Sequence, residues 1–263
     1  MKDVVEDAVP DTVLEVRDLD VAFGKHHVLK QVCLTVPKGR TLGLVGESGS
    51  GKSTLAKAVV GLVKPVGGQI LLDGTDLTHT KRTVEVRRRV QMIPQDPYSS
   101  LNPRMTIGET LAEALDPRRA SVKAHRKEIE ALLNRVALDG EVAARYPQEF
   151  SGGQRQRIAV ARALAVRPAL IIADEVTSAL DTSVQAEVLG VLRELRRELD
   201  LTMLFISHDL AVVRHVCDEV AVLQHGTLVE VAARDELFSA PRHDYTRLLL
   251  DSVPDGGPLR VAG

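Results

Sequence analysis

GESGSGKST (Gly46–Thr54) matches the phosphate-binding pattern G-x-x-x-x-G-K-[ST], although its Gly and Ser content would also suit a flexible linker. The flanking residues decide between these interpretations. TLGLV (41–45) is a short apolar run that indicates a buried strand, and residues 53–64 carry apolar side chains at helical spacing. A strand, a glycine loop and a helix in this order favour a loop that binds phosphate.

The glycines of this loop let the backbone curl so that its N–H groups point inward, and the positive end of the following helix adds to the field there. We expect Lys52 to reach the β- and γ-phosphates of a nucleotide and the Ser53 hydroxyl to bind Mg²⁺. The predicted nucleotide-binding residues of the loop are Gly46, Glu47, Ser48, Gly49, Ser50, Gly51, Lys52, Ser53 and Thr54.

The composition of the 263 residues argues against several functions. A formal net charge of −2, an aromatic content of 3% and the absence of Trp provide neither a basic surface nor base-stacking platforms, so no nucleic-acid partner is expected. Cys33 and Cys217 lie far apart, which favours two reduced thiols of a cytosolic protein. The acidic start is no signal peptide, and no apolar run approaches the ~20 residues of a membrane span.

The order of the elements predicts an α/β fold. Residues 13–36 read as extended, and 65–77 as a strand between two turns. Residues 121–138 read as an amphipathic helix, and the buried strands alternate with helices. We predict a P-loop NTPase core of the RecA-like type, with a mostly parallel sheet, an N-terminal antiparallel β subdomain and an inserted α-helical subdomain. The predicted domain spans 13–250, its helical subdomain about 96–160, and its flexible ends 1–12 and 251–263.

Three apolar strands end at polar residues that can do chemistry. TLGLV leads into the phosphate loop, ALIIA into Asp174 and Glu175, and TMLFI into Ser207 and His208. Ligands of an open parallel sheet bind at the carboxyl ends of its strands, so these residues should meet. Asp174 is the expected Mg²⁺ partner, and Glu175 could orient or deprotonate a water. The simpler alternatives are two carboxylates that cap the next helix and an ordinary loop histidine.

With these motifs together, the chain resembles the nucleotide-binding subunit of an ABC transporter. GESGSGKST is similar to the Walker A loop, ALIIADE to Walker B and FSGGQRQRIAVARAL to the family signature. Gln95 corresponds to the Q-loop, SALD (178–181) to the D-loop and His208 to the switch histidine. Phe23 stands where the family places an aromatic residue that stacks on adenine.

The resemblance implies a mechanism in which two subunits enclose two ATP molecules head to tail. Glu175 would be the general base, His208 would hold the γ-phosphate and the attacking water, and Gln95 would sense Mg²⁺ and signal to the membrane contact. The other residues that the resemblance places at the nucleotide, contacting the ATP of the opposite subunit or linking the two, are Ser151, Gly152, Gly153, Gln154 and Asp181.

Several segments resemble the peptide and nickel importer subfamily in particular, and QDPYSSLNPRM is more similar to the second ATPase of its pair. The implied partners are integral-membrane permease subunits, a second ABC ATPase in a heterodimer or homodimer, and indirectly an extracytoplasmic substrate-binding protein. The implied location is the cytoplasmic face of the membrane, with DPYSSLNPRM as docking surface. The sequence departs from the subfamily at Val176, usually Pro, at Phe150, commonly Leu, and at Phe23, more often Tyr.

Three alternatives remain open at this stage. A non-transport ATPase of a phosphonate-cleaving system has similar motifs. An ABC ATPase acting on DNA or ribosomes usually carries a long coiled-coil insertion or a second cassette, which this chain lacks. A cassette that binds ATP without hydrolysing it is expected to lose the residues found here as Glu175 and His208. The basic run Lys81–Arg89 favours a solvated helix face over a nucleic-acid site.

Overall fold

Two β-sheets form the framework of the computed structural model, which describes residues 11–79 and 82–252. The larger sheet has six strands in the order β10-β9-β3-β8-β7-β6, all parallel except β10. Its strands are β3 (Thr41–Val45), β6 (Val90–Ile93), β7 (Leu170–Asp174), β8 (Met203–Ile206), β9 (Glu219–Gln224) and β10 (Thr227–Ala233). The predicted α/β fold with a mostly parallel sheet is confirmed.

The central strands β3, β7 and β8 are buried at every residue. Because both faces of the sheet are covered, their sequences are continuously apolar instead of alternating. Leu44 of β3 pairs with Ile206 of β8, which pairs with Asp174 of β7. The three strands therefore reach the same edge at the same level, and the residues that follow them are brought together.

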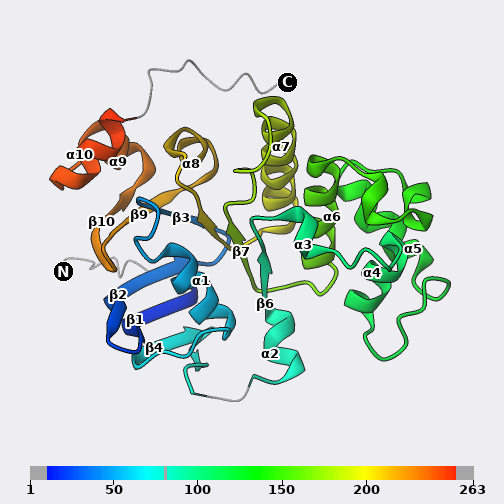
Figure 1. Cartoon of the computed structure of the whole chain (residues 1–263), viewed down its shortest axis with the longest axis horizontal. Helices are drawn as coiled ribbons and strands as arrows, with labels where there is room; N and C mark the ends of the chain where they lie inside the picture. The colour runs from blue at the N-terminus through cyan, green and yellow to red at the C-terminus, as the bar shows by residue number, and fades with distance from the viewer. Residues whose placement is uncertain (1–10, 80–81, 253–263) are drawn as a thin grey trace, which may run out of the picture.

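The smaller sheet is the predicted N-terminal antiparallel β subdomain. Its order is β2-β1-β4-β5, and every pairing is antiparallel. Its strands are β1 (Thr12–Phe23), β2 (His26–Pro37), β4 (Gly67–Leu72) and β5 (Thr75–Asp76). Figure 1 shows these strands in blue and cyan at the lower left.

Helix α1 (Lys52–Val60) joins the two sheets into one core. Leu55 of α1 packs in a single buried apolar cluster with Leu14 of the smaller sheet and Leu44 of the larger sheet. The helix ends at Gly61, whose φ of 83° is the left-handed conformation common after a helix. The phosphate loop at its other end is thus anchored from behind by a rigid element.

A second buried cluster covers the opposite face of the larger sheet and continues into a block of helices between β6 and β7. Residues 94–169 contain no strand, and Figure 1 shows their helices to one side of β6, β7 and α7. The elements of the block are α3 (Pro97–Ser100), α4 (Ile107–Leu115), α5 (Arg126–Arg135), η1 (Gly140–Ala144), η2 (Pro147–Glu149) and α6 (Gly152–Leu164). The remaining helices are α2 (Val84–Arg89), α7 (Thr182–Leu199), α8 (Leu210–Val216), α9 (Arg234–Ser239) and α10 (Asp244–Asp251).

Helix α5 is shorter than the helix predicted at 121–138. It begins at Arg126, after turns at 122–125 in which the Ser121 hydroxyl accepts a hydrogen bond from the N–H of Ala124. Such a local side-chain bond competes with helical hydrogen bonding. At the other end Ala137 has a φ of 54°, which stops the helix.

The flexible ends predicted at 1–12 and 251–263 lie mostly outside the described residues. Where they can be compared, Thr12 is already the first residue of β1, and Asp251 is the last residue of α10. Within 11–79 and 82–252, no helix combines the length and the hydrophobicity that a membrane span needs.

Candidate functional site

The loop between β3 and α1 has the backbone that the phosphate-binding pattern requires. Gly46, Gly49 and Gly51 have φ angles of 150°, 81° and 113°, which side chains rarely allow. A Cβ at Gly46 would lie 2.1 Å from the carbonyl oxygen of Leu223, and one at Gly51 would lie 2.8 Å from Leu29. The curl of this loop therefore depends on glycine at both ends.

The Lys52 side chain lies across the inside of the loop. Its Nζ donates hydrogen bonds of 2.8 Å to the carbonyl oxygens of Gly46 and Glu47, and only 5% of the residue is exposed. An ammonium group has three donors, so one is left for a phosphate oxygen. Burial lowers the pKa of Lys52, and the negative charges of Glu175 and Asp174 counteract only part of this shift. An anionic phosphate beside it would offset this desolvation.

Ser53 and Asp174 face each other at the end of β7. The Ser53 hydroxyl donates a hydrogen bond of 3.2 Å to Oδ1 of Asp174, which is 6% exposed. Burial raises the pKa of Asp174, while the bond from Ser53 opposes that shift. Two oxygen ligands of this kind suit a hard divalent cation, whose charge would compensate for the buried carboxylate.

Glu175 follows in an unusual backbone conformation. Its φ is 49°, and its N–H donates a 2.9 Å hydrogen bond to the carbonyl of Ile206 on the neighbouring strand β8. A left-handed residue other than glycine costs on the order of 1 kcal/mol, and such residues are concentrated at functional sites.

Both carboxylate oxygens of Glu175 have partners from distant segments. Nε2 of Gln95, just after β6, donates to Oε2 at 2.9 Å, and Nδ1 of His208, just after β8, lies 3.4 Å from Oε1. The Glu175 side chain is 17% exposed and that of His208 58% exposed. The structure thus brings together Gln95, Glu175 and His208, which are far apart in the sequence.

Ser178 belongs to this cluster and was missed as a site residue by sequence reasoning. Its hydroxyl accepts a 3.2 Å hydrogen bond from Gln95 and donates a 3.0 Å bond to the carbonyl oxygen of Glu175. The sequence signal that could have found Ser178 is its position three residues after Glu175, which is typical of a turn. In this turn the backbone N–H of Ser178 donates a 3.1 Å hydrogen bond to the Glu175 carbonyl.

The signature residues begin helix α6 and do not join this cluster. The exposed Ser151 is the N-cap, and its hydroxyl accepts a 3.3 Å hydrogen bond from the N–H of Gln154. In turn, the side-chain oxygen of Gln154 accepts a 3.0 Å hydrogen bond from the N–H of Ser151. A Cβ at Gly153 would lie 2.1 Å from Cγ1 of Val184 in α7, and one at Gly152 would lie 3.2 Å from Leu180. Both glycines thus also serve packing, and the exposed helix end is a possible anion-binding surface.

The other predicted residues occupy varied positions. Phe23, 55% exposed, lies at the turn end of the β1–β2 hairpin, where it pairs with His26. Asp181 is exposed and caps α7 by accepting a 3.0 Å hydrogen bond from the N–H of Val184. Within the loop, Glu47 and Ser48 are exposed and Thr54 is half-buried. The buried Ser50 hydroxyl lacks a hydrogen-bond partner in the described part of the chain, so it too could accept a ligand.

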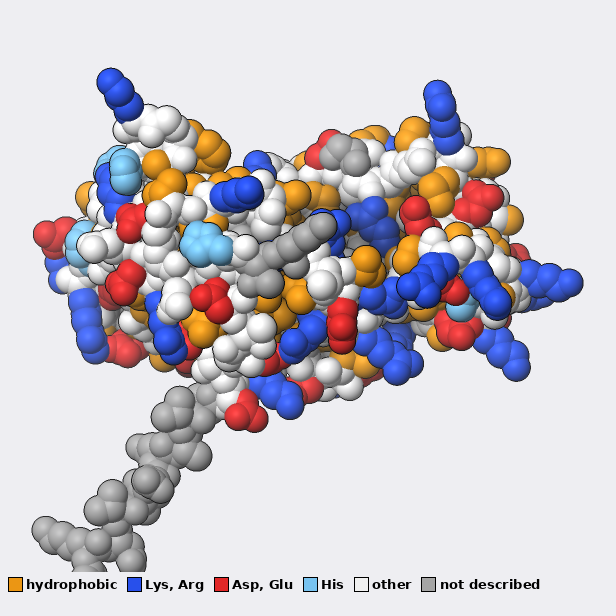
Figure 2. Space-filling view, turned by 90° about the horizontal axis from the view of Figure 1, so that it is seen from below, with side chains coloured by type: hydrophobic (Ala, Val, Ile, Leu, Met, Phe, Trp, Pro, Cys, Tyr) orange, Lys and Arg blue, Asp and Glu red, His pale blue; other side chains and the backbone are white. Residues whose placement is uncertain are grey.

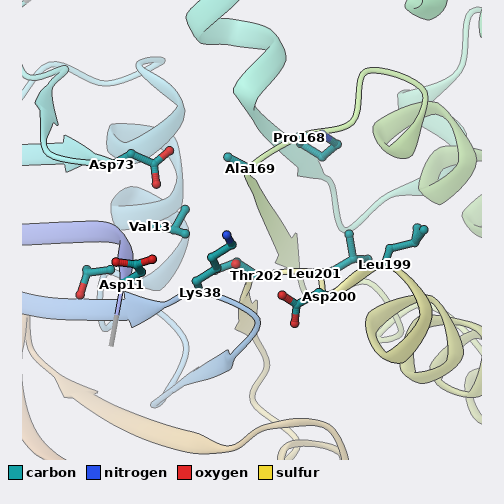
Figure 3. A pocket seen from close by; sticks show the side chains of 11 residues that line it. Asp11, Val13, Lys38, Asp73, Pro168, Ala169, Leu199, Asp200, Leu201 and Thr202 are labelled. Atoms are coloured by element: carbon teal, nitrogen blue, oxygen red, sulfur yellow. The ribbon is translucent and has the colours of Figure 1, made fainter. Parts of the chain in front are cut away.

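A separate cavity lies at the opposite edge of the larger sheet. It measures about 560 Å³ and is lined by residues that precede strands, among them Lys38, Ala169 and Thr202. Figure 3 shows Asp11, Asp73 and Asp200 around it together with Lys38. Because it lies at the amino ends of β3, β7 and β8, it is distinct from the site described above.

On the face shown in Figure 2, Lys and Arg side chains are most numerous in the right half, and Asp and Glu side chains lie among them. Three of the four described arginines of the basic run have structural partners, and the fourth, Arg87, is exposed. Arg82 donates to the carbonyls that end α1, Arg88 to carbonyls that end α4, and Arg89 pairs with Asp73. These contacts favour a structural role for the run over nucleic-acid binding, while Lys81 lies outside the described residues.

The arrangement can bind a phosphate chain and activate a water beside it. One half supplies backbone N–H groups, an ammonium and a pair of oxygens, and the other half supplies a carboxylate fixed by an amide and an imidazole. This combination is typical of enzymes that hydrolyse nucleoside triphosphates.

Comparison with known proteins gives consistent results. The family model described as ABC transporter matches residues 29–178, and one described as oligopeptide/dipeptide transporter, C-terminal region, matches residues 229–261. A Brucella ovis protein provisionally named a peptide import ATP-binding protein is 49% identical over 88% of this chain and 74% of its own. The oligopeptide transport ATP-binding protein AppF of Bacillus subtilis is 46% identical over 93% of this chain and 79% of its own.

A solved structure is similar as well. The ATP-binding cassette MJ0796, in a dimeric post-hydrolysis state bound to ADP and Pi, superposes with a TM-score of 0.74 at 27% identity. The match covers 84% of this chain and 98% of that one.

Proposed function

This chain belongs to the ABC transporter family, and on that premise we propose that it hydrolyses ATP to drive the import of peptides. The observation that carries this proposal is the position of Glu175, held by Gln95 and His208 beside the Lys52 loop. A cassette that only bound nucleotide would have no need for a carboxylate fixed in this way.

Hydrolysis follows from this geometry. A water lies between the γ-phosphate and Glu175, whose carboxylate accepts a proton from it as the oxygen attacks phosphorus. The bond between the γ-phosphorus and the β–γ bridging oxygen breaks, and ADP leaves with the bonding electrons. Gln95 and His208 keep the carboxylate in place, and Lys52 stabilises the negative charge on the phosphates. His208 also contacts the γ-phosphate from the exposed side.

Ser53, Asp174 and Gln95 are the residues that would hold Mg²⁺. The hydroxyl and carboxylate oxygens of the first two already lie 3.2 Å apart, and burial raises the pKa of Asp174, so a cation would stabilise this site. When bound, the metal supplies charge neutralisation for the phosphates. The side chain of Gln95 directs its amide nitrogen to Glu175, which leaves its oxygen as the available ligand.

The adenine ring stacks on Phe23, whose aromatic face is exposed at the end of the β1–β2 hairpin. Strand β2 of the hairpin also carries Leu29, which packs against Gly51 of the loop. The base and the phosphates are thus bound by the hairpin and the adjoining phosphate loop. Stacking on a single aromatic ring allows several offset arrangements of the base.

The active unit is a dimer of cassettes in which the signature residues Ser151, Gly152, Gly153 and Gln154 bind the ATP held by the opposite loop. The exposed N-terminus of α6 and its separation from the Glu175 cluster support this arrangement, because its dipole suits a γ-phosphate from another chain. Asp181, exposed at the start of α7, lies at the same interface. The dimeric state of MJ0796 supports it too.

The partners are membrane permease subunits at the cytoplasmic face and a second ABC ATPase subunit, in a heterodimer or a homodimer. Residues 96–105, directly after Gln95, form the docking surface, and the exposed Tyr98 belongs to it. The substrate class follows from the C-terminal match and from the names of the relatives, which favour peptides over nickel. An extracytoplasmic binding protein delivers the peptide to the permease.

The proposal is tested by purifying the full chain with its co-expressed membrane partners and reconstituting the complex in vesicles. We expect ATP-dependent uptake of a short peptide when the binding protein is added, and none with Glu175→Gln. Glu198→Gln, on the exposed side of α7, is the matched control and should support normal uptake. Recovery of soluble partners alone would contradict the transport role and leave the ATPase activity intact.

A further inference from the structure

Helix α10 contacts the phosphate loop through one tyrosine. The hydroxyl oxygen of Tyr245 accepts a 3.0 Å hydrogen bond from the backbone N–H of Glu47. Only 7% of Tyr245 is exposed, and burial raises the pKa of its hydroxyl group, which therefore stays neutral at physiological pH. The two residues are 198 positions apart in the chain, so the contact exists only in the folded protein.

This contact and Lys52 hold opposite ends of the same peptide unit. The carbonyl of Gly46 and the N–H of Glu47 belong to one planar peptide group. Its carbonyl oxygen accepts from Nζ of Lys52 at 2.8 Å, and its N–H donates to Tyr245. With both ends bound, the plane of the first peptide of the loop cannot rotate freely. That plane sets the direction in which the rest of the loop departs from β3.

Glu230 gives Tyr245 a rigid support. Its two carboxylate oxygens accept hydrogen bonds of 2.9 and 3.0 Å from the N–H groups of Arg242 and His243, directly before α10. The His243 ring accepts a further 3.1 Å bond from the N–H of Tyr245. Burial alone would raise the pKa of Glu230, but the neighbouring Thr246 side chain and the two N–H groups outweigh it, so the carboxylate is ionised near neutral pH.

We propose that Tyr245 is a positioning residue for ATP and that Glu230, together with residues 242–245, holds the phosphate loop in its binding conformation. The proposal rests on ATP binding at this loop and adds a function to the C-terminal region, which lies outside the ABC transporter match at 29–178. Tyr245 acts through the loop backbone and touches neither the phosphates nor the attacking water.

The expected effect is on affinity more than on turnover. Without the hydroxyl, the Gly46–Glu47 peptide can sample other orientations, and ATP must then order the loop when it binds. Once ATP is bound that cost has been met, and the Glu175 cluster is held by Gln95, His208 and Ser178 independently of α10. The Michaelis constant should therefore rise while the maximal rate changes little.

The decisive variant is Tyr245→Phe in the full chain, which removes one hydroxyl and keeps the buried ring. We expect the Kd of a fluorescent ATP analogue, measured with Mg²⁺, to rise about three- to tenfold, as for the loss of one hydrogen bond. The kcat for ATP should stay within about twofold of wild type. Ser239→Ala, which removes an exposed hydroxyl bond elsewhere in the same region, should bind the analogue normally.

Two further variants separate positioning from packing. Tyr245→Leu removes ring and hydroxyl together, and a purely structural tyrosine would make this variant unstable while Tyr245→Phe stayed normal. Glu230→Gln keeps the shape but places an amide NH₂ against a backbone N–H, so it should weaken analogue binding in the same direction as Tyr245→Phe. Lys52→Ala serves as the reference for a loop that no longer binds nucleotide.

A Kd for Tyr245→Phe within the error of wild type would overturn the proposal, as would a loss of kcat at unchanged Kd. Retention of binding by Lys52→Ala would instead overturn the nucleotide site itself. The expected result is a raised Kd in Tyr245→Phe and Glu230→Gln, an unchanged Kd in Ser239→Ala and lost binding in Lys52→Ala.

Discussion

The edge of the larger sheet and the start of helix α6 both carry residues of the predicted site, but their contacts differ. At the sheet edge, Gln95, Glu175 and His208 come from three segments and bind one another. At the start of α6, the side chains of Ser151 and Gln154 accept hydrogen bonds from each other's backbone N–H groups. The first region is organised by contacts between distant segments, whereas the second is a helix end whose exposed N-cap Ser151 is held by these local bonds.

In the proposed dimer, this difference explains why one chain would hold only part of a working site. Residues that do chemistry on a bound ligand need fixed partners, and the sheet edge provides them through tertiary contacts. A surface that closes on a ligand held by another molecule needs a stable helix end and no internal partner. Substitutions in each region can test whether catalysis at the sheet edge and the role of the α6 start are separable.

The largest effect is expected from Glu175→Gln. The amide keeps the shape and the contacts with Gln95 but cannot accept a proton, so the rate of ATP hydrolysis should fall by about 10²–10⁴-fold with ATP affinity retained. Steady-state turnover and equilibrium binding on the same preparation check this. A variant that hydrolyses ATP at the wild-type rate would remove Glu175 from the mechanism.

Lys52→Ala should abolish measurable nucleotide binding, because it removes the buried ammonium that both closes the loop and faces the phosphates. We expect a loss of roughly 100-fold or more in affinity, comparable to losing a preorganised charged donor. Lys57→Ala, on the exposed side of α1, is the matched control. Equal affinities of the two variants would argue against the phosphate loop as the binding site.

Gly153→Ala tests whether the signature helix is also a packing element. The added Cβ would collide with Val184, so unfolding in urea should show a loss of about 1–3 kcal/mol. Val184→Ala removes Cγ1, the atom that the added Cβ would meet. The double variant should therefore be more stable than the sum of the two single effects predicts. If stability recovers and ATPase activity does not, Gly153 has a role beyond packing; additive effects would contradict the collision.

The smallest effect is expected from Asp174→Asn without nucleotide. Burial raises the pKa of Asp174 above its unfolded value of 3.8, so the folded chain binds this proton more tightly than the unfolded chain. The stability that protonation confers is therefore lost as the pH rises through the folded pKa. Asparagine avoids the buried charge and should raise the free energy of unfolding at pH 7. The advantage should shrink as the pH is lowered toward 4; a constant difference would assign it to packing.

Much of the sheet edge could be predicted from the sequence because its signals are local. A glycine pattern between a strand and a helix, and acidic residues after a buried strand, are visible within about ten residues each. The parallel sheet follows from continuous apolar runs such as LIIAD (170–174), which fit only strands covered on both faces. The fold and the grouping of Asp174, Glu175 and His208 then follow from topology.

The contacts that could not be predicted join distant or locally ambiguous residues. Nothing near Tyr245 in the sequence indicates that its hydroxyl meets Glu47. Ser178 lies within a motif assigned to the resemblance, but its bond to Gln95 depends on how β6 and β7 are placed side by side. Helix α5 was predicted too long because a turn closed by a Ser121 side chain has the same apolar spacing as a helical turn.

The left-handed backbone at Glu175 restricts how a gene for this protein could lose hydrolysis and still encode a folded chain. At a φ of 49°, Gly, Asn and Asp are accommodated easily, whereas β-branched side chains are strongly disfavoured. One nucleotide change in a glutamate codon can produce Lys, Gln, Ala, Gly, Asp or Val, and of these six only Val is β-branched. Duplicated copies that have drifted into non-hydrolysing regulators are therefore expected to carry Val least often at this position.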